Sequence, residues 1–168
     1  MLKEVERLYA LAKKEDIKLF PLDVRSLAEK LGLIVEDYND LENTEQYSTL
    51  TKKETGEIVL DVNQDKSIQK QRLGIAHQIG HTVLQKDFMD AAGAGVWCNG
   101  EILGELDAEA EIFAWFLLVP MQQINELLAA KVPLNVNVLA DAFEVPRKGM
   151  RQHLKRLGFF TKNRDPLG

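Results

Sequence analysis

A helical segment with two histidines decides how this chain folds and where its chemistry lies. Its residues are Arg72-Leu73-Gly74-Ile75-Ala76-His77-Gln78-Ile79-Gly80-His81. Apolar residues surround the two imidazoles, which indicates a buried helix. At 3.6 residues per turn, histidines four positions apart lie on one face, one turn from each other. This is the spacing with which two histidines of one helix bind a single Zn²⁺, although two ordinary histidines can also share a helix face.

A third ligand is expected from a second apolar helix, predicted from Glu105 to about Leu118 and stopped by a proline. Two histidines leave a catalytic zinc site incomplete, because it takes three protein ligands and keeps a fourth position for water. Glu109 shares a face with apolar residues, where a carboxylate is unfavourable unless it is paired or bound to metal. We therefore predict Glu109 as the ligand, with Asp107 and Glu111 as second choices that could instead be solvated first-turn acids.

Composition limits the class of protein. The chain has 168 residues, of which 45% are apolar, enough for one domain with a real core. Its single cysteine excludes an internal disulfide framework and a four-thiolate zinc site. The net charge of −5 argues against direct DNA binding by the chain as a whole. Neither an apolar run of about 18 residues nor the apolar core of a signal peptide is present, so we expect a cytoplasmic protein without a membrane partner.

The remaining pattern is mixed. Helical spacing of apolar residues predicts helices at 2–12, 23–31, 121–131, 138–143 and 147–157. A short strand is predicted at 33–35, and alternation at 47–51 and 58–62 predicts a hairpin. The glycine-rich residues 91–100 indicate a loop. The predicted fold class is α+β, with a small antiparallel sheet packed beside the histidine helix. We expect a first part at 1–135 and helix-turn-helix-like C-terminal helices at 136–168, packed on it.

Three segments resemble the ImmA/IrrE family of zinc metallopeptidases. The histidine helix matches the family pattern R-x-x-[IL]-A-H-E-[IL]-G-H, and residues 109–120 match E-A-N-x-F-A-x-x-L-L-M-P, with Glu111 in place of the asparagine. Residues 139–158 are similar to the family's C-terminal pattern. The resemblance implies a zincin-like fold, bound Zn²⁺ and Glu109 as the third ligand. It also implies an anti-repressor that cleaves a helix-turn-helix transcriptional repressor and so derepresses phage or mobile-element genes.

Gln78 departs from the family pattern at the residue that performs the chemistry. In H-E-x-x-H sites the carboxylate after the first histidine accepts a proton from the attacking water and later passes it to the leaving amine. Glutamine keeps the shape but cannot accept the proton at neutral pH. The expected protein therefore binds zinc and peptide but lacks a rate factor of roughly 10²–10⁴. An engineered or recently inactivated enzyme is favoured over a natural pseudoprotease that binds a repressor without cutting it.

Four further side chains are candidates for minor roles. Tyr47 and His153 could stabilise an oxyanion, or they could be a half-buried strand residue and a surface histidine. Trp97 lies in the glycine-rich segment, which could cover a cleft but is more simply a connecting loop. Cys98 could be a soft metal ligand, although the resemblance supplies a carboxylate for that place.

The C-terminal helices have the spacing of a helix-turn-helix, with a turn at Val145-Pro146. Basic residues follow one face of the second helix: Arg147, Lys148, Arg151, Lys155 and Arg156. A DNA-binding regulator with a vestigial metal motif is therefore an alternative hypothesis. A packing or substrate-docking role is favoured, because the whole chain is acidic.

Overall fold

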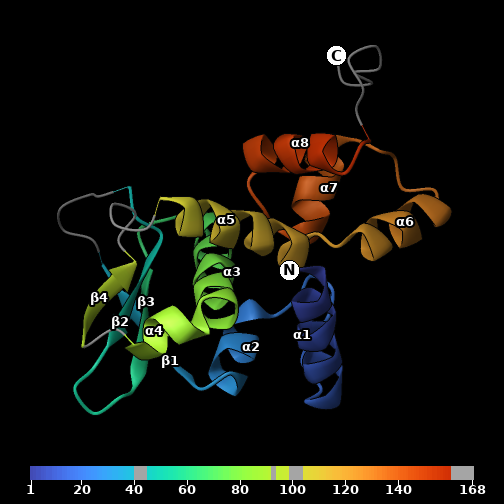
Figure 1. Cartoon of the computed structure of the whole chain (residues 1–168). Coiled ribbons are helices and arrows are strands. Elements are labelled where there is room, and N and C mark those ends of the chain that lie inside the picture. Colours follow the sequence, from blue (N-terminus) through green and yellow to red (C-terminus); the bar gives the residue numbers. More distant parts are fainter. Residues whose placement is uncertain (40–44, 92–93, 99–103, 160–168) are drawn as a thin grey trace.

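The α+β fold class is confirmed by a computed structural model, which describes residues 1–39, 45–91, 94–98 and 104–159 (Figure 1). The helices are α1 (Leu2–Lys14), α2 (Val24–Lys30), α3 (Ile68–Leu84), α4 (Lys86–Ala91), α5 (Glu105–Leu118), α6 (Met121–Ala129), α7 (Val136–Phe143) and α8 (Arg147–Arg156). The strands are β1 (Leu33–Tyr38), β2 (Ser48–Lys52), β3 (Ile58–Asn63) and β4 (Gly95–Cys98).

The strands form one sheet in the order β1-β3-β2-β4. The predicted hairpin is confirmed, with Leu50 of β2 opposite Leu60 of β3. The sheet is mixed, because β1 pairs parallel with β3 and places Val35 next to Leu60. Buried Val59, Leu60 and Val62 make β3 suited to a central position with a neighbour on each side. The expectation of a purely antiparallel sheet is therefore wrong in this detail.

The predicted loop at 91–100 is partly a strand. Gly95–Cys98 forms β4 and pairs antiparallel with the outer edge of β2, where Thr51 lies opposite Val96. Local glycine content favours a loop, but the unpaired backbone of β2 offers hydrogen-bond partners that override this preference. Trp97 and Cys98 therefore belong to a strand. Residues 92–93 and 99–103 of this connection lie outside the described residues.

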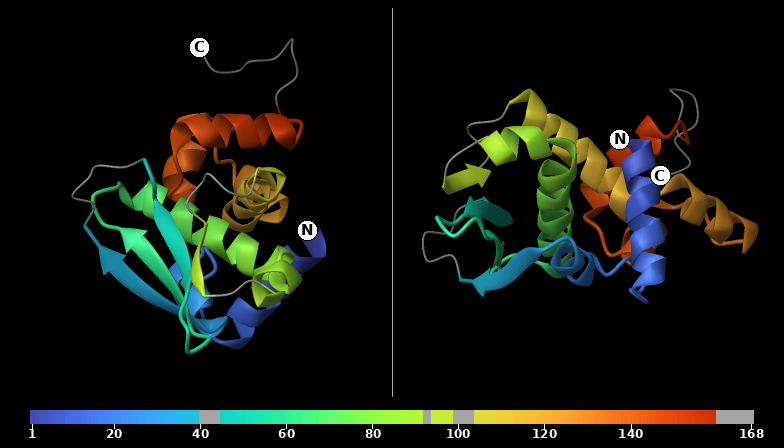
Figure 2. Two further views of the ribbon diagram at one scale, coloured as in Figure 1. Left: turned by 60° about the vertical axis from the view of Figure 1, so that its left-hand side comes forward. Right: turned by 60° about the horizontal axis from the view of Figure 1, so that its bottom comes forward.

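Helix α3 lies between the sheet and α5, and two glycines allow this close packing (Figure 2). A Cβ atom on Gly74 would lie 2.8 Å from Ser48 Oγ, at the start of β2. A Cβ atom on Gly80 would lie 3.1 Å from the carbonyl oxygen of Ala110 in α5. Side chains at either position would push a neighbouring element away from α3. The sequence of α3 thus brings β2 and α5 to the two histidines.

Helices α7 and α8 also pack in the hydrophobic core, and α8 lies above α5 in Figure 1. Phe143, Met150 and Leu154 are fully buried in the same core as α5. Gly149 allows the closest approach, because a Cβ atom there would lie 2.0 Å from the indole ring of Trp115. The C-terminal helices are thus part of the main core, while the proposed division after residue 135 stays a prediction.

The buried Arg72 of α3 secures the end of α7. Its guanidinium donates to the carbonyl oxygens of Glu144 and Phe143, at 3.2 and 3.5 Å. It also lies 3.5 Å from the Glu144 carboxylate. These contacts occupy carbonyls at the C-terminus of a helix, where a cation is favourable. The turn between α7 and α8 is therefore held by the helix that carries the histidines.

One stretch of the described chain, Glu105–Ala129, has the length and hydropathy of a membrane span. It consists of two helices, because Pro120 separates α5 from α6. The buried side chains of α5 pack in the protein core, among them Phe113, Ala114 and Leu117. Helix α5 is therefore a core helix of this domain.

Candidate metal centre

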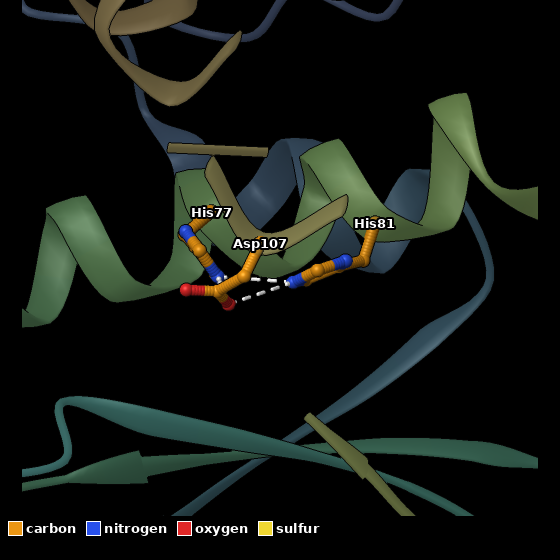
Figure 3. A group of neighbouring side chains, drawn as sticks. All are labelled: His77, His81 and Asp107. Atoms are coloured by element: carbon orange, nitrogen blue, oxygen red, sulfur yellow. Dashed lines mark hydrogen bonds and ion pairs between the residues drawn. The ribbon is translucent and has the colours of Figure 1, made fainter. Parts of the chain in front are cut away.

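Three potential ligand atoms converge between α3 and the first turn of α5 (Figure 3). His77 Nε2 lies 3.0 Å from His81 Nε2 and 3.0 Å from Asp107 Oδ1. His81 Nε2 lies 3.5 Å from the same carboxylate oxygen. Two imidazole nitrogens and a carboxylate are a ligand set typical of a catalytic zinc site. The arrangement confirms that α3 directs both imidazoles to one point.

Asp107, not Glu109, is the carboxylate that the structure brings to the histidines. The direction of α5 is set by Ala110, which packs against Gly80, and residue 107 lies on the same helix face as residue 110. Glu109 is displaced by about 200° around the helix from Asp107 and is exposed to solvent. The expected ligand set His77, His81 and Glu109 therefore differs from the observed group in its third member. Glu111 is also exposed and outside the group.

Gln85 orients His81, and sequence reasoning did not identify it. Its side-chain oxygen lies 2.5 Å from His81 Nδ1, and its amide nitrogen donates to the Leu106 carbonyl oxygen at 2.8 Å. The oxygen can only accept, so Nδ1 carries the proton and the Nε2 lone pair faces Asp107. Metal-binding histidines are commonly held by such a partner on the opposite ring nitrogen. The signal in the sequence is the continued four-residue spacing from His77 through His81 to Gln85.

The electrostatics of the group suit a cation. Burial lowers the pKa of His81, which is fully buried, and so favours the neutral imidazole that binds metals. The hydrogen bond with His77 lowers the pKa of Asp107 and keeps it a carboxylate. Lone pairs of His81 Nε2 and of the Asp107 carboxylate thus point toward His77 Nε2. A metal cation placed between the three residues could accept a lone pair from each of them. The residues present fit a divalent metal ion such as Zn²⁺.

Gln78 follows His77 in α3 and is almost entirely buried, with 3% of its surface exposed. Its amide nitrogen lies 3.3 Å from both the carbonyl oxygen and the hydroxyl of Ser48, at the start of β2. Its side-chain oxygen is also buried but has no hydrogen-bond partner among the described residues. Buried acceptors are rarely left unpaired, so this oxygen marks a place for a donor such as a water molecule.

The minor candidates occupy different places. Tyr47 precedes β2 and packs against α3, where its Cβ would lie 2.9 Å from a Cβ on Gly74. The Lys70 ammonium lies 5.2 Å from the centre of its ring. A role for Tyr47 in oxyanion stabilisation stays a prediction. His153 is fully buried between α8 and α5, stacked on Trp115, rather than on the surface.

His153 makes the stability of the fold sensitive to acid. Its Nε2 donates to the Val119 carbonyl oxygen at 3.0 Å, while the buried Nδ1 has no partner among the described residues. Burial lowers the pKa of His153 from its ordinary 6.5 to about 4. At pH values between about 4 and 6.5, the imidazole of His153 is protonated in the unfolded chain but neutral in the folded chain. The free energy of unfolding should therefore fall as the pH drops through this window, by up to roughly 3 kcal/mol.

The variant His153→Phe should show a weaker loss of stability between pH 7.5 and 5. Its stability at pH 7.5 will be lower because the bond to Val119 is lost. Urea unfolding of both metal-free proteins at the two pH values measures the difference. The carboxylates are the same in both proteins, so their contribution to the pH dependence of stability is equal. Equal pH dependence in the two proteins would show that His153 does not carry the effect.

The sequence profile of a peptidase family matches most of the chain. This family, Peptidase M78, is described as an IrrE N-terminal-like domain, and the match covers residues 22–155. The matched region contains α3, α5, α7 and all but the last residue of α8. No curated protein sequence matches the chain significantly.

Proposed function

Because the chain belongs to the Peptidase M78 family, we propose that it is a zinc-binding, repressor-directed relative of these metallopeptidases in which Gln78 replaces the general base. The family membership supports a metallopeptidase-like protein. The repressor as target rests on the resemblance of the histidine helix and of residues 109–120 to the ImmA/IrrE motifs. Such a target places the protein in the cytoplasm, where a helix-turn-helix repressor is found.

His77, His81 and Asp107 would hold the metal ion. Zinc, when bound, acidifies a water molecule and polarises the carbonyl group of a peptide. The residues of the chain do the rest. Gln85 fixes the ring and the proton of His81, and Asp107 brings a negative charge from α5. The backbone contacts at Gly80 hold the two helices at the distance that this arrangement needs.

One observation carries the proposal of a cleavage-deficient protein, namely the position of Gln78. The residue is buried next to His77 in the chain, its amide nitrogen contacts Ser48, and its oxygen has no hydrogen-bond partner among the described residues. A neutral amide can orient a water molecule through this oxygen but takes no proton from it at neutral pH. The step that needs a general base is therefore slow, while metal and peptide binding do not depend on it.

A natural pseudoprotease is a second candidate, and the contact with Ser48 supports it. The Ser48 carbonyl oxygen lies 3.3 Å from the amide nitrogen of Gln78, and a glutamate at this position could not donate to it. A glutamine introduced recently would not be expected to match its surroundings in this way. Under this hypothesis the protein sequesters a repressor by binding alone.

The test uses the full chain and the helix-turn-helix repressor encoded nearest to its gene. The zinc-loaded protein and the repressor are mixed, separated by size-exclusion chromatography and analysed by mass spectrometry. We expect the two to elute together with the repressor intact. Repressor fragments would show that Gln78 does not prevent cleavage. Separate elution would contradict the anti-repressor function, irrespective of the metal site.

A further inference from the structure

The C-terminal helices concentrate positive charge in an acidic protein. Residues 136–158 contain five Lys and Arg against two Asp and Glu, whereas the whole chain has a net charge of −5. The whole-chain charge averages over surfaces that face different directions, so it does not describe this one. This local excess of positive charge indicates a binding partner that carries negative charge.

Helix α8 separates its apolar and basic residues onto opposite faces. Gly149, Met150 and Leu154 pack toward α5, on the side that forms the core. Lys148 and Lys155 are exposed on the other side. The basic face is therefore not needed to hold the helix in place, and it is displayed by a helix that the core keeps rigid.

A groove lies between the outer sides of α7 and α8. Its polar lining consists of Asn137, Arg147, Lys148, Arg151, Gln152 and Lys155. The carboxylate of Asp141 lies 3.3 Å from the Arg147 guanidinium and neutralises part of the charge at one end. Cations and side-chain amides thus line one surface together, without a carboxylate among the lining residues.

The two helices also have the arrangement of a DNA-reading element. Helix α7 ends at Phe143, three residues form the turn, and α8 begins at Arg147 and crosses α7 steeply (Figure 1). Glu144 has a left-handed backbone (φ 53°), which reverses the chain, and Arg72 bonds its carbonyl oxygen from below. The turn is thus fixed by the core of the protein. In helix-turn-helix proteins the second helix enters the major groove of DNA.

We propose that the groove and the outer face of α8 form a binding site for duplex DNA. Lys148 and Lys155 would contact the phosphate backbone, and the amides of Asn137 and Gln152 are suited to the edge of adenine. The side-chain amides favour DNA over an acidic protein, because an acidic protein could be bound by the positive charges alone. The lining of this groove includes none of the three residues of the metal group, His77, His81 and Asp107, so DNA binding does not require the metal centre.

Binding is tested by fluorescence anisotropy with a labelled 30-base-pair duplex and the full chain. With about four phosphates neutralised, affinity should fall roughly 100-fold between 50 and 200 mM NaCl. The double variant Lys148→Glu/Lys155→Glu should lose at least about 10-fold in affinity at 50 mM NaCl. The matched control is Lys3→Glu/Lys53→Glu, which makes the same change of net charge at exposed residues elsewhere and should bind as the unmodified chain does. Circular dichroism of all three proteins checks that they are folded.

Three outcomes would overturn the proposal. The first is the absence of DNA binding at 50 mM NaCl, and the second is an equal loss in both double variants. The third is binding of poly-glutamate that depends on Lys148 and Lys155 while DNA binding does not. That result would assign the groove to an acidic protein partner. Failure here would leave the peptidase proposal unaffected, because the two sites share no residues.

Discussion

Replacing Gln78 with glutamate should raise the rate of repressor cleavage by roughly 10²–10⁴-fold, the usual contribution of general acid–base catalysis. The new carboxylate would take the place of the buried, unpaired oxygen of Gln78, the residue that follows His77 in α3. It can accept the proton that the amide cannot. Zinc content should not change, because His77, His81 and Asp107 already supply three ligand atoms. Cleavage is measured as repressor fragments over time, with equal zinc loading in both proteins.

The structure also predicts a side effect of this change. A carboxylate at position 78 leaves the Ser48 carbonyl oxygen without its donor, although the Ser48 hydroxyl can turn to donate to it. We expect Gln78→Glu to lower the free energy of unfolding by about 1–2 kcal/mol. The variant Gln78→Ala loses the same contacts without gaining a base, so it controls for loosened packing. If Gln78→Glu is folded, zinc-loaded and bound to the repressor but leaves it uncut, the chain is a pseudoprotease.

Changing Asp107 to alanine should abolish stoichiometric zinc binding, whereas Glu109→Ala should leave it unchanged. The Asp107 carboxylate lies 3.0 Å from His77 Nε2, and Glu109 is exposed on another face of α5. Removing a direct ligand should weaken the zinc affinity by more than the roughly 10–100-fold typical of an outer-shell change. Gln85→Ala is a change of this kind, because Gln85 contacts His81 at Nδ1, the ring nitrogen that is not in the ligand group. The zinc affinity of Gln85→Ala should lie between those of Asp107→Ala and Glu109→Ala.

Zinc content after dialysis and competition with a chelator measure the three affinities. Both carboxylate variants remove one negative charge from α5, so a nonspecific effect of charge would appear in both. Zinc loss in Glu109→Ala with retention in Asp107→Ala would contradict the observed geometry and support the family-based assignment. Retention in both would show that neither carboxylate is needed.

The two histidines and their helix could be predicted from the sequence, because a four-residue spacing places side chains on one face whatever surrounds the helix. Proline and glycine positions also gave good bounds for α5 and for the hairpin. These features depend on local geometry. The same holds for Gln78, whose chemical consequence follows from its residue type and its neighbour His77.

Features that depend on tertiary packing could not be predicted in the same way. The choice between Asp107 and Glu109 requires the rotation of α5 about its axis, which the contact of Ala110 with Gly80 determines. An apolar neighbourhood in the sequence of α5 surrounds both carboxylates, so it does not distinguish them. The strand β4 likewise exists only because β2 offers it an edge. Gln85 continues the four-residue spacing of the two histidines, but this spacing alone does not show that its amide contacts His81, since an amide has no preference for metal sites until its partner is known.

The close contact at Gly80 links the evolution of two distant sequence positions. Because α5 lies directly against the backbone of α3 there, the short side chain of Asp107 is long enough to reach His77. A methyl group at residue 80 would force Ala110 and Phe113 of α5 to move by a few tenths of an ångström, and this would shift the Asp107 carboxylate relative to His77. We therefore expect substitutions at positions 80 and 107 to be correlated among relatives.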